Sequence, residues 1–118
     1  MLTMLGIPNC DTIRKARRFL ESLGIAYRFR DVRQEPLSDD EWRELLAQRE
    51  PGELVNVKSP SFRKTGIRTA ALDRHSAVAV LREQPSAMKR PVMLAGGRVA
   101  AVGFSEEGYA RLDSGKDS

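Results

Sequence analysis

The sequence predicts an α/β (α+β) fold in which one mixed β-sheet is flanked by helices. Three observations lead to this prediction: the chain opens with a β-α-β pattern, continues through mainly helical segments, and closes with a β-hairpin and a helix. Its 118 residues suffice for one domain with its own hydrophobic core, so we expect a single domain over 1–118.

The opening unit begins with a short apolar run over 2–6, which indicates a strand. Apolar residues then recur at helical spacing between residues 11 and 23, and Gly24 suits the position just after a helix. Residues 25–32 alternate apolar and polar side chains, as a half-buried strand does.

The middle of the chain is predicted to be helical. One helix starts near Ser38, has acidic residues in its first turn and is stopped by Pro51-Gly52. Ser-Pro and Gly66 break the segment that follows into short helical pieces and loops. A firmer helix begins after Asp73 and ends before Pro85.

The last third is predicted to form a β-hairpin and a terminal helix. Two apolar runs flank Gly96-Gly97, which suits a tight two-residue turn. Ser105 is expected to cap the helix, and the tail over 114–118 is expected to be frayed.

Composition limits the possible functions. The formal net charge is +4 and fifteen of the twenty basic residues are arginine, which suits recognition of carboxylates and oxyanions. No apolar run is long enough to span a membrane and no signal sequence is recognisable, so we expect a cytoplasmic protein without a membrane partner. One cysteine and one histidine predict no structural zinc site and no internal disulfide, and no tightly bound cofactor is expected.

The single cysteine, Cys10, precedes the first predicted helix and would occupy its N-cap. Unpaired backbone amides and the helix dipole favour a thiolate at that position, and Arg14, one turn later, is expected to reach it. We interpret Cys10 as a nucleophile whose redox partner comes from outside; the alternative is a small buried hydrophobe.

Other uses of a thiol or of the positive charge are disfavoured by spacing. A phosphatase-type loop would need arginine at position 16, which is Ala16, and a cysteine protease would need a remote catalytic histidine. His75 lies beside Arg74 near a helix start and is interpreted as structural. The sequence does not predict a nucleic-acid partner, because no aromatic-basic stacking motif or DNA-reading helix is recognisable.

Four segments, "GIPNCDTIRKARRFLESLGI", "LVNVKSPSFRK", "KRPVML" and "VGFSEEGY", resemble the arsenate reductase family that includes ArsC and Spx, and within it a YffB-like branch. The resemblance implies a thioredoxin-like sheet with a helical insertion, here about 34–88. It also implies a cis peptide bond at Arg90-Pro91, with Pro91 facing Cys10.

The resemblance further assigns residues to the site. Cys10 matches the nucleophile, Arg14 the basic residue one turn later, and Arg90 and Arg98 two arginines that bind arsenate. Asn56 stands where the remaining arginine is expected, with Lys58 nearby. The other expected substrate-binding residues are Asn9, Pro91, Phe104 and Ser105.

These expectations favour a glutathione-dependent thiol reductase, a thiol-disulfide oxidoreductase with glutathione as co-substrate. Its substrates would be small-molecule disulfides or oxyanions. A glutathione- and glutaredoxin-dependent arsenate reductase is the alternative, although the incomplete set of arginines counts against arsenate. An Spx-like regulatory or binding module is the alternative of another class, but Ile13 replaces the second cysteine of its CxxC switch.

Overall fold

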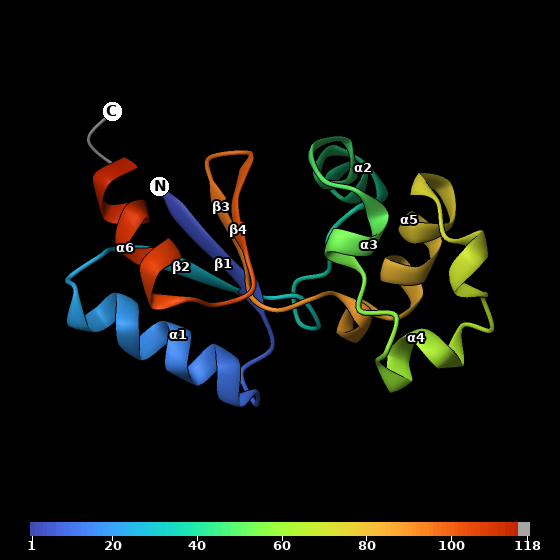
Figure 1. Cartoon of the computed structure of the whole chain (residues 1–118), viewed down its shortest axis with the longest axis horizontal. Helices are drawn as coiled ribbons and strands as arrows, with labels where there is room; N and C mark the ends of the chain where they lie inside the picture. The colour runs from blue at the N-terminus through green and yellow to red at the C-terminus, as the bar shows by residue number, and fades with distance from the viewer. Residues whose placement is uncertain (116–118) are drawn as a thin grey trace. The chain divides into compact units, whose positions relative to one another are not determined.

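The computed structural model describes residues 1–115, and its contacts group the chain into two compact units (Figure 1). The sheet unit contains Met1–Asp31 and the chain from Arg90 onward, and the helical unit is Val32–Lys89. The helical unit covers the predicted insertion of 34–88.

The sheet unit is built on four strands in the order β2-β1-β3-β4. The strands are β1 (Leu2–Gly6), β2 (Tyr27–Asp31), β3 (Val92–Ala95) and β4 (Arg98–Val102). β1 pairs in parallel with β2 and antiparallel with β3, and β3 pairs antiparallel with β4. The predicted mixed sheet is confirmed.

Helix α1 (Asp11–Ser22) connects the two parallel strands, and α6 (Glu106–Gly115) follows β4. The two helices lie against the same face of the sheet (Figure 1). That face and the helices share one core cluster. The cluster consists of Leu2, Met4, Ile13, Ala16, Leu20, Ile25, Met93 and Tyr109.

Local sequence explains the bounds of these elements. Gly24 has φ +69°, which ends α1 as predicted, and Gly96 has φ +65° in the hairpin turn; both values favour glycine. The Ser105 hydroxyl accepts a hydrogen bond from the Gly108 amide at 3.0 Å and caps α6. Helix α6 extends to Gly115, so the predicted fraying does not begin at 114, and residues 116–118 lie outside the described residues.

The helical unit contains short helices joined by tight turns. They are α2 (Asp39–Gln48), α3 (Pro51–Leu54), α4 (Pro60–Lys64), η1 (Thr69–Ala71), α5 (Arg74–Glu83) and η2 (Pro85–Ala87). Ser38 and Asp73 accept hydrogen bonds from N3 amides in capping boxes that begin α2 and α5.

Proline has a different role here from the one predicted. Helix α2 ends at Gln48, and Pro51 is the first residue of α3, where its missing N–H costs no hydrogen bond. Trp42 and Phe62 are buried in this unit. None of the helices between residues 1 and 115 is long and apolar enough to cross a membrane.

Candidate active site

Cys10 lies at the N-cap of α1, as predicted, four residues after the end of β1. Its backbone is extended, with φ −140° and ψ 127°, and its carbonyl accepts a hydrogen bond from the Arg14 amide at 3.0 Å. Its side chain makes no capping hydrogen bond and is half-buried against the core cluster. The thiol therefore does not cap the helix and is partly accessible to solvent. It lies beside backbone amides of the first helical turn that have no partner within the helix.

The Arg14 side chain, which was expected to reach Cys10, forms an ion pair within its own helix. Its guanidinium pairs with the Asp11 carboxylate at 3.0 Å, one turn back along the helix. The expectation that it points to the thiol is thus corrected: the neighbouring carboxylate competes for it. Both side chains are mostly exposed, at 52% and 89%, so water screens this ion pair and it can open.

The Arg90-Pro91 peptide bond is cis, as the resemblance implied. Pro91 immediately precedes β3, and its carbonyl accepts a hydrogen bond from the Gly103 amide at 2.8 Å. Gly103 has φ +78° and leads directly into Phe104 and Ser105. The loop before α6 is therefore fixed against Pro91.

Strand register places Pro91 at the same end of the sheet as the β1–α1 loop. Leu5 near the end of β1 pairs with Val92, whereas Leu2 at its start pairs with Ala95. Arg98 pairs with Ala95 and so lies at the opposite end of the sheet. The four residue-to-residue steps from Pro91 to Ala95 correspond to about 13 Å.

This register corrects the assignment of Arg98 to the Cys10 site. The sequence placed Arg98 directly after a glycine turn but could not show at which end of the sheet the turn lies. Arg98 is an exposed residue at the tip of the hairpin.

The remaining predicted residues are found in both units. Asn9 is exposed and immediately precedes Cys10, and Arg90 is half-buried. Asn56 and Lys58 belong to the helical unit, where the Asn56 side-chain oxygen accepts a hydrogen bond from the Lys58 amide at 3.1 Å. This is the local turn that leads into α4, and a role for these two residues towards Cys10 stays a prediction.

An aromatic cluster next to the site was not predicted. The Phe104 ring lies edge-on to the Tyr109 ring and to the Phe19 ring, with centroid distances of 4.9 Å and 5.7 Å respectively. The Tyr109 hydroxyl is fully buried and has no hydrogen-bond partner among the described residues. Burial raises the pKa of Tyr109 above its ordinary value. Only the helical spacing of residues 105–112 could have indicated that Tyr109 faces the core.

Arg17 on α1 packs against β2, and its side chain is half-buried. Its guanidinium lies 4.4 Å from the centre of the Phe29 ring, and its Nε donates a 2.9 Å hydrogen bond to the Tyr27 hydroxyl. Arg17 therefore covers the aromatic residues of β2 rather than serving the site.

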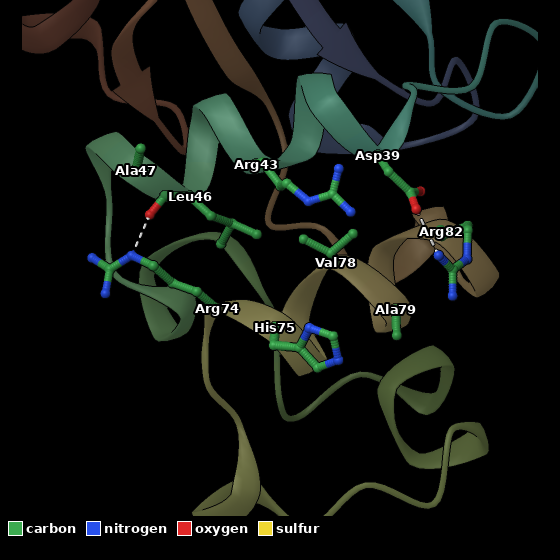
Figure 2. Close-up of a pocket in the computed structure, with 9 residues that line it drawn as sticks. All are labelled: Asp39, Arg43, Leu46, Ala47, Arg74, His75, Val78, Ala79 and Arg82. Atoms are coloured by element: carbon green, nitrogen blue, oxygen red, sulfur yellow. Dashed lines mark hydrogen bonds and ion pairs between the residues drawn. The ribbon is translucent and has the colours of Figure 1, made fainter.

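A groove of about 290 Å³ lies in the helical unit between α2 and α5 (Figure 2). Leu46 and Val78 contribute apolar surface, and His75 lines it as an exposed residue. Arg82 pairs with Asp39 at 2.7 Å, and the Arg74 Nε donates to the Leu46 carbonyl at 2.7 Å (Figure 2). These contacts tie α5 to α2, which agrees with a structural interpretation of this region.

The family comparison covers most of the chain, because the model described as the ArsC family matches residues 5–112. The chain belongs to the ArsC family. The global transcriptional regulator Spx of Listeria innocua is 32% identical over 114 residues, covering 95% of this chain and 86% of Spx.

Solved structures agree with this membership. A structure described as YffB (PA3664) protein has a TM-score of 0.83 at 33% identity, covering 94% of this chain and 97% of that one. An arsenate reductase (ArsC) related protein from Brucella melitensis has a TM-score of 0.75 at 35% identity, covering 93% and 92%. The fold is thioredoxin-like with a helical insertion.

Proposed function

We propose that this ArsC-family protein is a thiol-disulfide reductase that uses Cys10 as its nucleophile and glutathione as its co-substrate. The observation that carries the proposal is the half-buried Cys10 thiol, which makes no capping hydrogen bond at the N-terminus of α1. Backbone amides directed towards that position stabilise negative charge on sulfur. The 35% identity to an arsenate reductase (ArsC) related protein from Brucella melitensis also supports redox chemistry at this site.

The reaction is a pair of thiol-disulfide exchanges. The Cys10 thiolate attacks the glutathione sulfur of a mixed disulfide; the new bond joins Cys10 to glutathione, and the other thiol leaves as a thiolate that takes a proton. A second glutathione thiolate then attacks the glutathione sulfur bound to Cys10. Oxidised glutathione leaves and Cys10 is regenerated, so one cysteine suffices for the cycle.

Binding of glutathione would use groups at the Cys10 end of the sheet. Arg90 and the backbone amides at Phe104 and Ser105 can hold its carboxylates, and the chain beside Pro91 can pair with its cysteinyl backbone. The hydrogen bond from Gly103 to Pro91 holds these groups near one another. Asn9 and Arg14 would contact glutathione from the β1–α1 loop and the first turn of α1. Arg14 would exchange its ion pair with Asp11 for one with the bound anion.

A turnover assay tests the proposal. Purified protein is given excess glutathione and, as substrate, the mixed disulfide between glutathione and 2-mercaptoethanol. The oxidised glutathione that forms is measured through the NADPH that glutathione reductase consumes. Steady turnover that is abolished in Cys10→Ser is expected, with Arg98→Gln as the matched arginine control that retains activity. Turnover no faster than the uncatalysed reaction would refute the proposal.

Arsenate is the second substrate to test. The likeness to an arsenate reductase related protein favours it. Glutathione oxidation driven by arsenate with glutaredoxin supplied, in the absence of any mixed disulfide, would assign arsenate reduction instead.

A regulatory role is the candidate of another class, and the 32% identity to the Spx regulator favours it. In that case the function would be binding rather than turnover. Binding to a transcription complex that is equally strong in the wild type and Cys10→Ser would support it, because no reaction of the thiol would then be required.

A further inference from the structure

A shallow groove of about 340 Å³ lies on the sheet unit, between α1 and the beginning of α6. It is lined by Lys15, Arg18, Phe19, Ser22, Phe104 and Glu106. Of these lining residues, only Phe104 is among the predicted substrate-binding residues.

The groove runs along α1 away from the proposed nucleophile. With a rise of 1.5 Å per residue, Lys15 lies about 7.5 Å and Ser22 about 18 Å from Cys10 along the helix axis. Lys15, Arg18 and Ser22 share one face of the helix, because they are three and seven residues apart. Phe104 follows Gly103, whose amide is bound to the Pro91 carbonyl. The groove therefore begins beside the proposed glutathione site.

The chemistry of the lining is apolar and cationic. The Phe19 and Phe104 rings meet edge to face, with their centroids 5.7 Å apart. Both residues are only half-buried, and both line the groove. Lys15 and Arg18 are exposed, and neither makes a hydrogen bond or ion pair with any side chain described between residues 1 and 112. Glu106 is the single acidic lining residue, so the groove carries a net positive charge.

Lys15 and Arg18 differ from the exposed arginines Arg14 and Arg111, which form ion pairs. Arg111 on α6 pairs with Glu107 at 2.7 Å, and Arg14 pairs with Asp11. A cation without a carboxylate partner gives up no ion pair when it binds a new anion. Lys15 and Arg18 are therefore the lining side chains best suited to an acidic ligand.

We infer that this groove binds the polypeptide that flanks a glutathionylated cysteine, with an acidic side chain against Lys15 and Arg18 and an apolar one against Phe19 and Phe104. The inference rests on the proposed function and specifies its substrate. A single small thiol bound at Cys10 would not extend 7.5 to 18 Å, whereas about two to five extended residues would. Charge complementarity accounts for the acidic preference.

The exchange step fixes which part of the substrate occupies the groove. Cys10 attacks the glutathione sulfur, so glutathione stays on Cys10 and the peptide sulfur is the leaving group. The peptide cysteine leaves as a thiolate, takes a proton and dissociates with its flanking residues. Free glutathione then reduces the Cys10 mixed disulfide.

Two synthetic peptides test the inference. Both carry one glutathionylated cysteine with glutamate three residues and phenylalanine four residues away on each side; in the second peptide both glutamates are replaced by lysine. The measured quantity is the ratio of kcat/KM for release of the two peptide thiols. We expect the glutamate peptide to be favoured about three- to tenfold at low ionic strength, with a smaller ratio at high salt.

Variants assign the preference to the groove. Lys15→Gln with Arg18→Gln should bring the ratio close to one, and Arg18→Glu should favour the lysine peptide. Arg111→Gln is the matched control, because it removes an exposed arginine on α6 outside the groove and should leave the ratio unchanged. Taking a ratio within one variant cancels any change in the reactivity of Cys10.

The outcomes separate the two proposals. Equal kcat/KM for both peptides in the wild type, or a preference that survives in the double variant, would overturn the groove assignment while the reductase activity stands. Absence of turnover with these peptides and with the 2-mercaptoethanol disulfide would overturn the proposed function and the groove assignment together.

Discussion

Tyr109→Phe is expected to stabilise the protein. The Tyr109 hydroxyl is fully buried without a partner among the described residues. An unsatisfied buried hydroxyl costs about 1–3 kcal/mol, so its removal should raise the free energy of unfolding by about 1 kcal/mol. Phenylalanine retains the ring contact with Phe104 at 4.9 Å. For a domain of this size that corresponds to a rise in Tm of about 4 °C.

The same substitution changes the dependence of stability on pH. Burial raises the pKa of Tyr109, so above about pH 10 the unfolded chain loses this proton while the folded chain keeps it. The free energy of unfolding of the wild type should therefore fall as the pH rises above 10. Tyr109→Phe should lack that part of the decrease.

Urea unfolding followed by circular dichroism at pH 7 and pH 10.5 measures both effects. Tyr27→Phe is the matched control, because the Tyr27 hydroxyl accepts a hydrogen bond from Arg17 at 2.9 Å and its removal should not stabilise the fold. A lower free energy of unfolding for Tyr109→Phe at pH 7 would refute the reasoning, since it would mean that the hydroxyl is satisfied in the folded state.

Three further substitutions test the local structure. Ser38→Ala removes the cap of α2 and should cost about 1 kcal/mol in urea unfolding; no loss would contradict the capping box. Gly6→Ala places a Cβ against the Ile13 side chain and should cost about 1–3 kcal/mol in urea unfolding. Unchanged stability would show that the Ile13 side chain moves aside without cost. Asp73→Asn tests acid stability: hydrogen bonds from the backbone and side chain of Ser76 lower the pKa of Asp73 from 3.8. The stability that comes from the lowered pKa is present above pH 3.8 and is lost as the pH falls through the lowered pKa. The free energy of unfolding of the wild type should therefore approach that of Asp73→Asn in this range. A difference between the two that stays constant from about pH 5 to about pH 2 would contradict this.

Much of the fold follows from local sequence signals that the structure uses directly. Ser38 and Asp73 cap helices because their oxygen atoms satisfy exposed amides, and Gly24 ends α1 in the left-handed region. The N-cap position of Cys10 follows in the same way, from a proline and a loop before an amphipathic helix. These interactions span only a few residues, so sequence spacing is enough to predict them.

Features that depend on strand register or on competition between side chains were predicted less well. Arg98 lies at the far end of the sheet because of how β3 pairs with β1, which the hairpin sequence does not encode. Arg14 pairs with Asp11, because this carboxylate competes with the thiol for the guanidinium. The buried Tyr109 hydroxyl likewise depends on packing between α6 and the sheet.

The reaction of Cys10 with oxidised glutathione is the most direct test of the account. Intact mass is followed over time for the folded protein and for the same chain in urea, and reduced glutathione is then added. The account predicts that the folded protein gains one glutathionyl group faster than the unfolded chain and loses it again to reduced glutathione. A folded protein that stays unmodified, or that reacts more slowly than its unfolded chain, would contradict the claim that this site activates the thiol for exchange.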